Sequence, residues 1–305
     1  MPARPIVIAH RGASGYLPEH TLVAKALAVG LGADYLEQDV VATRDGALIV
    51  FHDLILDDTT DVREKFPGRA RTDGHYYCID FTLAEIAELT VGERRIPGGN
   101  EPRFPQRFPD GAGRFPIVTL REELDFIRGL RCSMGRPIGI YPEVKEPDWH
   151  RRHGVELGAK LLGELDASGF GAHVDGVFIQ CFDASELQRL RQSTTHQLVQ
   201  LLDSAGGQPT LNVLQDIRHY ADAIGPSLKL VSRGGNGAGA TRTTLVKDAH
   251  RAGLAVHAYT ARQDELPPGV GSFSELMGLL FADESVDGVF TDFPDLVCGY
   301  LGRQG

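Results

Sequence analysis

Two histidines directly follow short apolar runs, and each has a charged residue beside it. His10 and Arg11 follow residues 6–9, and His52 and Asp53 follow residues 48–51. Such runs are typical of buried strands. A rigid strand that ends in a histidine suits a functional site, because the loop after it leaves room for a ligand. For either pair alone, a strand end that simply meets solvent is the alternative interpretation.

Three carboxylates and a lysine occur within two further apolar runs. Glu37 and Asp39 are two residues apart in 35–41, and Glu143 and Lys145 are two apart in 137–145. Residues two apart on a strand point to the same face. Carboxylate oxygens are hard ligands, so this set predicts a site for Mg²⁺ or Ca²⁺ rather than zinc. The alternative is a structural network in which Arg11 and Lys145 neutralise the acids.

Histidines beside a divalent cation suit phosphoryl chemistry. One imidazole would take a proton from the attacking oxygen, and the other would protonate the leaving alkoxide. Arg11 and Lys145 would stabilise the charge that develops on the phosphate oxygens, together with the cation. Gln180, His257 and Asp292 also end or interrupt apolar runs, so we expect them near the same site.

Composition excludes several classes of partner. The 305 residues carry a formal net charge of −10, which disfavours binding to nucleic acid or anionic membranes. No apolar run approaches the roughly 18 residues of a membrane span. The four cysteines are widely spaced and contain no CxxC pair, so we expect reduced thiols rather than a zinc site or a disulfide framework.

Strands and helices alternate along most of the chain. Expected strands near residues 6, 36, 138, 177, 198, 224–230, 256 and 288 alternate with helical segments. Eight such repeats predict an α/β fold, a (β/α)8 barrel, formed by residues 1–53 and 117–305. A doubly wound open sheet is the alternative, and the weak sixth strand is where the count could fail. In a barrel, the carboxyl ends of all strands meet at one face, where these polar residues would gather.

Residues 54–116 interrupt this alternation. The segment follows the second strand and its hairpin partner, is rich in proline and glycine, and contains one short helical pattern. A segment of 63 residues exceeds an ordinary connection. We therefore predict an inserted lid or subdomain at 54–116.

The order of these motifs resembles that of a known family over nearly the whole chain. The sequence is similar to the glycerophosphodiester phosphodiesterase family, and most similar to its bacterial periplasmic type through residues 32–39 and 180–183. The shared motifs are His10-Arg11-Gly12, Pro18-Glu19-His20-Thr21, Glu37-Gln38-Asp39, His52-Asp53, Pro142-Glu143-Val144-Lys145 and Thr291-Asp292-Phe293-Pro294.

The resemblance implies a TIM barrel with an inserted segment and a metal-dependent hydrolase. Its substrates would be small glycerophosphodiesters such as glycerophosphocholine and glycerophosphoethanolamine, converted to sn-glycerol 3-phosphate and an alcohol. It implies one Ca²⁺ or Mg²⁺ at Glu37, Asp39 and Glu143, with His10 and His52 as the acid/base pair. Arg11 and Lys145 would bind the phosphate, and we expect Gln180, Phe182 and His257 to contact the substrate.

Some alternatives stay open at this point. A phospholipase D-like lyase that releases a cyclic phosphate, or a non-catalytic binding protein, would use the same fold. Direct attack by water and initial attack by the glycerol 2-hydroxyl are equally compatible with the motifs. We expect a periplasmic location if an export signal has been removed from the sequence, and a cytoplasmic one otherwise. The sequence also leaves open whether the chain forms a homodimer.

Overall fold

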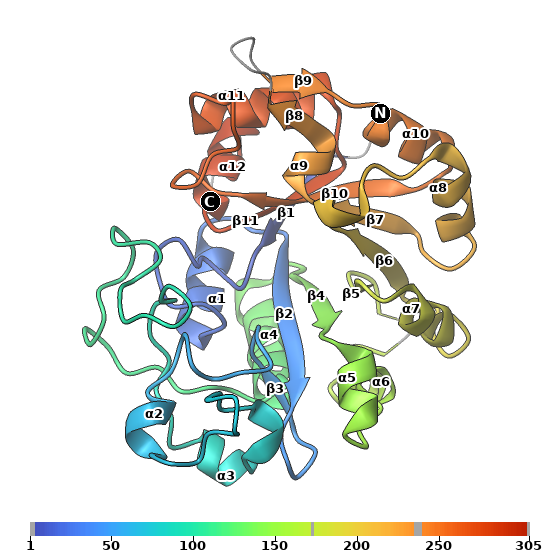
Figure 1. The fold of residues 1–305 in the computed structure, drawn as a ribbon. Helices are drawn as coiled ribbons and strands as arrows, with labels where there is room; N and C mark the ends of the chain where they lie inside the picture. The colour runs from blue at the N-terminus through green and yellow to red at the C-terminus, as the bar shows by residue number, and fades with distance from the viewer. Residues whose placement is uncertain (1–3, 172–173, 235–239, 304–305) are drawn as a thin grey trace.

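The computed structural model describes residues 4–171, 174–234 and 240–303, and its centre is a closed parallel barrel (Figure 1). The strand order is β1-β11-β10-β7-β6-β5-β4-β2, and pairing of β1 with β2 closes the ring. The barrel prediction is confirmed, and the open sheet is excluded. The strands are β1 (Ile6–Ala9), β2 (Tyr35–Ala42), β4 (Gly139–Val144), β5 (Phe178–Cys181), β6 (Gln197–Leu202), β7 (Ala223–Pro226), β10 (Ala255–Ala261) and β11 (Gly288–Thr291).

The barrel strands are apolar on both faces because both faces are buried. On β1, Ile8 points into the barrel, where it packs with Tyr141 and Phe290. Its neighbours Val7 and Ala9 point outward into the larger core beneath the helices. This arrangement explains why the strands appear in the sequence as short continuous apolar runs rather than as alternating ones.

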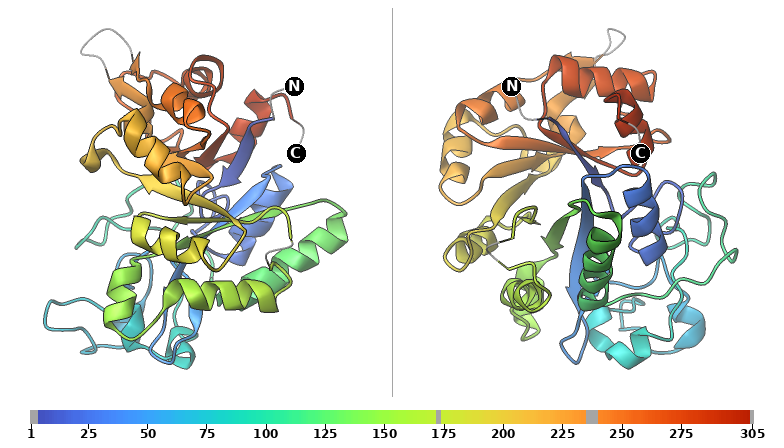
Figure 2. Two further views of the ribbon diagram at one scale, coloured as in Figure 1. Left: turned by 90° about the vertical axis from the view of Figure 1, so that its right-hand side faces the viewer. Right: turned by 180° about the vertical axis from the view of Figure 1, so that it is seen from behind.

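Helices cover the outside of the barrel (Figure 2). The longest, α4, begins at a capping box in which Thr119 and Glu122 bond to each other's main chain, as the Thr-x-x-Glu pattern predicts. No helix in the described parts of the chain is both long and apolar enough to cross a membrane. The helices are α1 (Leu22–Gly30), α4 (Leu120–Met134), α5 (Pro147–Arg152), α6 (Leu157–Ala167), α7 (Ala184–Arg191), α8 (Leu211–Arg218), α9 (Leu228–Val231), α10 (Leu245–Arg251), α11 (Phe273–Met277) and α12 (Pro294–Tyr300).

Residues 54–116 have little regular structure, as predicted from their composition. They contain α2 (Val62–Lys65), a 3-10 turn (Cys78–Asp80) and α3 (Leu83–Ile86). The segment follows β3 (Leu48–Val50), which pairs antiparallel with β2 outside the barrel. Its apolar residues form a second core with Val41, Ile49 and Phe51, beside the β2–β3 hairpin (Figure 1). Its role as a lid stays a prediction.

Candidate active site

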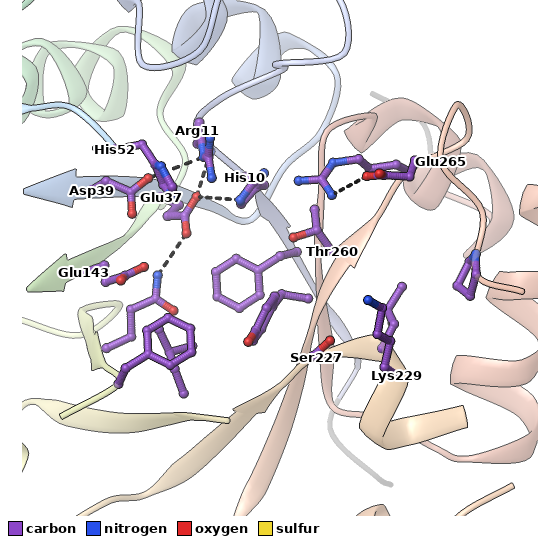
Figure 3. Close-up of a pocket in the computed structure, with 18 of the residues that line it drawn as sticks. His10, Arg11, Glu37, Asp39, His52, Glu143, Ser227, Lys229, Thr260 and Glu265 are labelled. Atoms are coloured by element: carbon purple, nitrogen blue, oxygen red, sulfur yellow. Dashed lines mark hydrogen bonds and ion pairs between the residues drawn. The ribbon is translucent and has the colours of Figure 1, made fainter. Parts of the chain in front are cut away.

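Three buried carboxylates from two neighbouring strands converge at the carboxyl end of the barrel. Glu37 and Asp39 lie on β2, and the register pairs Asp39 with Glu143 of β4. One oxygen from each of the three lies within 4.8 Å of the others. All three line a cavity of about 490 Å³ (Figure 3). The prediction that these acids lie together is therefore met.

The electrostatics of this cluster fit a bound divalent cation. Burial and the charge of Asp39 raise the pKa of Glu37 well above its usual value. Burial, with Asp39 again nearby, raises the pKa of Glu143 to about 7 although Lys145 opposes this. Burial would also raise the pKa of Asp39, but Lys145, His52 and His20 outweigh it. Asp39 Oδ1 has no hydrogen-bond partner among the described residues. A cation would relieve this repulsion and occupy the free oxygen, and the all-oxygen donor set suits Mg²⁺ or Ca²⁺.

His10 is held at the cavity wall by a carboxylate behind it. Its Nδ1 lies 2.7 Å from Asp292 Oδ1, and its Nε2 lies 3.9 Å from Glu37 Oε2. An ionised carboxylate only accepts, so His10 carries its proton on Nδ1 and leaves the Nε2 lone pair free. Burial, followed by the charge of Arg11, lowers the pKa of His10 to about 3. The imidazole is therefore neutral at pH 7 and able to take a proton.

His52 repeats this arrangement from another element. It follows β3, and its Nδ1 lies 2.6 Å from Asp53 Oδ1. Burial and the charges of Arg11 and Lys145 lower its pKa to about 4. Both histidines line the cavity that the carboxylates line, so two neutral imidazoles flank one candidate metal site.

Arg11 and Lys145 place positive charge between these groups. Arg11 has a left-handed backbone (φ 59°), an unusual conformation for a residue with a side chain. Its main-chain N–H donates to Glu37 Oε2 at 2.8 Å, and its guanidinium lies 3.4 Å from Asp39 (Figure 3). Lys145 Nζ lies 2.8 Å from Glu143 Oε1 and 3.7 Å from Asp39 Oδ1. Both cations line the cavity and could contact an anionic ligand beside the metal.

The other predicted substrate contacts divide into two groups. Gln180 and Phe182 line the cavity, and Gln180 donates to Glu37 Oε1 at 3.0 Å. His257 is not among the described residues that line it. His257 lies near the amino end of β10, buried, with its Nδ1 2.7 Å from the hydroxyl of Tyr141. His257 therefore does not lie where the prediction of a substrate contact requires, because its Nδ1 is bonded to Tyr141 inside the barrel.

Sequence reasoning gave no specific role to several residues that the structure places here, although it predicted that Asp292 lies near the site. His20 Nε2 lies 2.7 Å from Asp39 Oδ2 and fixes that carboxylate. Asp53 and Asp292 are hydrogen-bonded to His52 and His10. The sequence does indicate both aspartates, because Asp53 follows a histidine and Asp292 directly follows a predicted strand. Other lining residues come from later elements: Ser227 and Lys229 follow β7, Tyr259 and Thr260 lie in β10, and Glu265 follows it.

A buried polar group supports β2 from behind. Gln38 points away from the cavity, and its side-chain N–H donates to Glu123 at 2.9 Å. Lys25 lies 2.8 Å from the same Glu123 oxygen and also donates to the main-chain carbonyl of Glu37. The β2 backbone that carries Glu37 and Asp39 is thus anchored to α1 and α4.

Fold and site together define a (β/α)8-barrel protein in which three buried acids and two histidines line one cavity at the barrel mouth. The chain belongs to the glycerophosphoryl diester phosphodiesterase family, whose profile matches residues 10–296.

Named relatives extend this comparison over the whole chain. The chain is 39% identical to the glycerophosphodiester phosphodiesterase of Haemophilus influenzae, over 99% of this chain and 91% of that protein. It is 37% identical to the enzyme of the same name from Treponema pallidum, over 98% of this chain and 92% of the other.

Solved structures share the fold. A putative glycerophosphoryl diester phosphodiesterase from Silicibacter pomeroyi superposes with a TM-score of 0.75 at 24% identity, over 99% of this chain and 94% of that one. A phosphodiesterase from Oleispira antarctica, solved in complex with the product sn-glycerol-3-phosphate, superposes with a TM-score of 0.68 at 21% identity, over 98% of each chain.

Proposed function

We propose that this protein hydrolyses glycerophosphodiesters to sn-glycerol 3-phosphate and an alcohol. The observation that carries the proposal is that the clustered Glu37, Asp39 and Glu143 line the same cavity as His10 and His52. The names of the relatives at 37–39% identity agree with this activity. The product bound to the Oleispira antarctica phosphodiesterase indicates that this fold accepts a ligand of that size.

The cofactor in this proposal is one Ca²⁺ or Mg²⁺ held by the three carboxylates. A bound divalent cation supplies charge stabilisation to phosphate oxygens. Arg11 and Lys145 bind and orient the same phosphate from its other sides. The cavity of about 490 Å³ has the volume of a small-molecule site, so glycerophosphocholine and glycerophosphoethanolamine are the substrates we propose.

The two histidines divide the proton transfers. The free Nε2 of one neutral imidazole accepts the proton of the attacking hydroxyl, and the other ring donates to the departing alkoxide. The carboxylate behind each Nδ1 stabilises the imidazolium form during the step. The base acts from the neutral form that each ring has in this structure, whereas the acid must first gain a proton on Nε2, which the negative charge of a bound phosphodiester favours.

A coupled assay for sn-glycerol 3-phosphate tests the proposal. It uses a panel of headgroups, first with a chelator and then with Ca²⁺ or Mg²⁺ added back. We expect turnover that stops with chelator and returns with one of the ions. His10→Ala should lower kcat at least about a hundredfold, the usual contribution of a general acid or base. A cyclic phosphate as the final product indicates a lyase instead. Substrate binding without turnover in the wild type indicates a binding protein.

A further inference from the structure

Two arginines in residues 54–116 donate hydrogen bonds to the aspartates that are bonded to the two histidines. Arg94 Nη1 donates to Asp53 Oδ2 at 2.7 Å, while the other oxygen of Asp53 faces His52. Arg107 Nη2 donates to Asp292 Oδ2 at 2.8 Å, while the other oxygen of Asp292 faces His10. The same chain of arginine, aspartate and histidine therefore occurs twice, each time with the arginine supplied by this segment.

Neither arginine is placed to touch the substrate. Arg94 and Arg107 are not among the described residues that line the 490 Å³ cavity. They line a separate space of about 80 Å³ that also borders His10 and His52. This space is too small for a glycerophosphodiester but large enough for a few water molecules. The two arginines therefore act on the reaction only through the residues that they hold, of which Asp53 and Asp292 are the ones bonded to the histidines.

Further contacts make both arginines rigid. The Arg94 guanidinium also donates to both oxygens of Glu19, at 2.6 and 3.2 Å, and Glu19 accepts from Arg11 at 2.9 Å. Arg94 thus connects His52 to Arg11, a proposed phosphate ligand.

Arg107 bonds to both oxygens of Asp264, at 2.8 and 3.0 Å, and lies over the ring of Phe104. The side chains of Arg94 and Arg107 are only 14% and 6% exposed. Paired, buried guanidinium groups of this kind have few alternative conformations.

A carboxylate orients a histidine only if the carboxylate is itself held in place. Asp53 and Asp292 each keep one oxygen for the imidazole because an arginine occupies the other. We propose that Arg94 and Arg107 are positioning residues, which fix the rings of His52 and His10 through Asp53 and Asp292. The segment 54–116 then completes the active site as well as bordering it. This inference rests on the proposed function.

The two arginines should differ in importance. Arg262 Nε also donates to Asp292 Oδ2, at 2.7 Å, so Asp292 keeps one guanidinium partner when Arg107 is removed. Asp53 has no second arginine partner within the described residues. The loss of Arg94 should therefore disturb the site more than the loss of Arg107.

Steady-state kinetics with saturating metal provide the first test. We expect Arg94→Ala to lower kcat about 10- to 100-fold, as loss of such supporting partners does, with KM changed less than about threefold. Arg107→Ala should lower kcat less, and Arg94→Lys should recover part of the loss. The control is Arg95→Ala, because Arg95 also belongs to the segment but, within the described residues, its guanidinium pairs only with the exposed Asp110, at 3.7 Å. Wild-type kcat in both Arg94→Ala and Arg107→Ala overturns the inference.

Proton NMR provides a second readout that does not depend on turnover. A histidine N–H donated to a carboxylate gives a resonance downfield of the amides, and His10→Ala and His52→Ala assign the two signals. Arg94→Ala should shift or broaden the His52 signal and leave that of His10 in place. Arg107→Ala should do the reverse. Both signals unchanged in both variants overturn the inference, even if the proposed reaction is correct.

The two proposals fail in distinguishable ways. Loss of the proposed function shows as no product from the wild type, or as full activity in His10→Ala and His52→Ala. In that case the proton NMR measurement still shows whether the arginines position the histidine rings. An active wild type with inactive histidine variants and unaffected arginine variants retains the function and removes the positioning role.

Discussion

The ammonium of Lys25 lies 2.8 Å from the carboxylate of Glu123, and both side chains are fully buried behind β2. Glu123 also accepts from Gln38, and Lys25 donates to the main-chain carbonyl of Glu37. A buried ion pair contributes little net stability compared with an apolar pair, but removing one partner leaves an uncompensated charge. The pair therefore acts mainly on the placement of the β2 backbone that carries Glu37 and Asp39, two of the candidate metal ligands.

We predict that Lys25→Met lowers the free energy of unfolding by about 3–5 kcal/mol, measured by urea denaturation. The double variant Lys25→Met with Glu123→Met should be more stable than Lys25→Met alone, because no buried charge is left unpaired. The exposed Asp125, which pairs with Arg128 on α4, provides the control, and Asp125→Ala should cost less than about 1 kcal/mol. A double variant no more stable than Lys25→Met would show that lost packing, not lost charge, is responsible.

Removing one charge from the cluster of Glu37, Asp39 and Glu143 should affect the stability of the metal-free protein and its stabilisation by metal differently. Glu37→Gln relieves repulsion with Asp39 and Glu143, so we predict an unchanged or higher Tm with chelator present. The rise in stability on adding Ca²⁺ or Mg²⁺, about 2.7 kcal/mol at a hundredfold excess over Kd for the wild type, should shrink markedly. Thermal melts with and without the ion measure both effects, with the exposed Glu88→Gln as control. Equal metal-induced stabilisation in Glu37→Gln and wild type excludes the proposed site.

That the acids and His10 lie together could be predicted, because their positions follow from the alternation of side chains along a strand and from the closure of the barrel. Strand alternation places Glu37 and Asp39 on one face, and the closed barrel brings the ends of β1, β2 and β4 together. His257 was misplaced because β10 runs from Ala255 to Ala261, so this residue lies near its amino end. An apolar run in the sequence identifies a strand, but it shows less clearly at which residues the strand begins and ends.

Arg94 and Arg107 could not be predicted in the same way. They lie in an irregular segment whose path is set by contacts between distant residues, such as Arg107 with Asp264 and Asp292. No helical or strand period determines where such a segment crosses the barrel mouth. Their partners Asp53 and Asp292 did carry a signal, because each adjoins a predicted strand end.

Glu93 provides a pH-dependent prediction outside the metal cluster. Burial raises its pKa to about 7 from the usual 4.5, with Arg107 opposing and with Glu19, Asp292 and Asp110 reinforcing the shift. Its Oε1 has no hydrogen-bond partner in the described part of the protein. Below pH 4.5 the group is protonated in both folded and unfolded states and has no effect. Between pH 4.5 and 7 only the unfolded state loses the proton, so the folded state becomes progressively less favoured, and above pH 7 the penalty is constant.

Glu93→Gln should therefore stabilise the protein relative to wild type at pH 8, by at most about 3.5 kcal/mol at about 1.4 kcal/mol per pKa unit. The difference should decrease as the pH falls from 7 and disappear near pH 4.5. Urea denaturation at several pH values measures this, and the exposed Glu101→Gln provides the control. A constant difference between the two proteins from pH 5 to pH 8 contradicts the assignment.

The attacking oxygen can be identified from substrates that differ only at the glycerol 2-hydroxyl. In the proposed reaction the two imidazoles transfer protons and no side chain acts as a covalent nucleophile, so either the internal hydroxyl or water attacks phosphorus. We predict the internal route, with a cyclic glycerol phosphate visible by phosphorus NMR early in turnover and consumed later. A 2-deoxy analogue should then bind with similar affinity but be cleaved at least about a hundredfold more slowly, because an intramolecular nucleophile has a large advantage in effective concentration. Equal cleavage of the two substrates, with no cyclic species at any time, would establish direct attack by water and make a histidine-activated water the nucleophile.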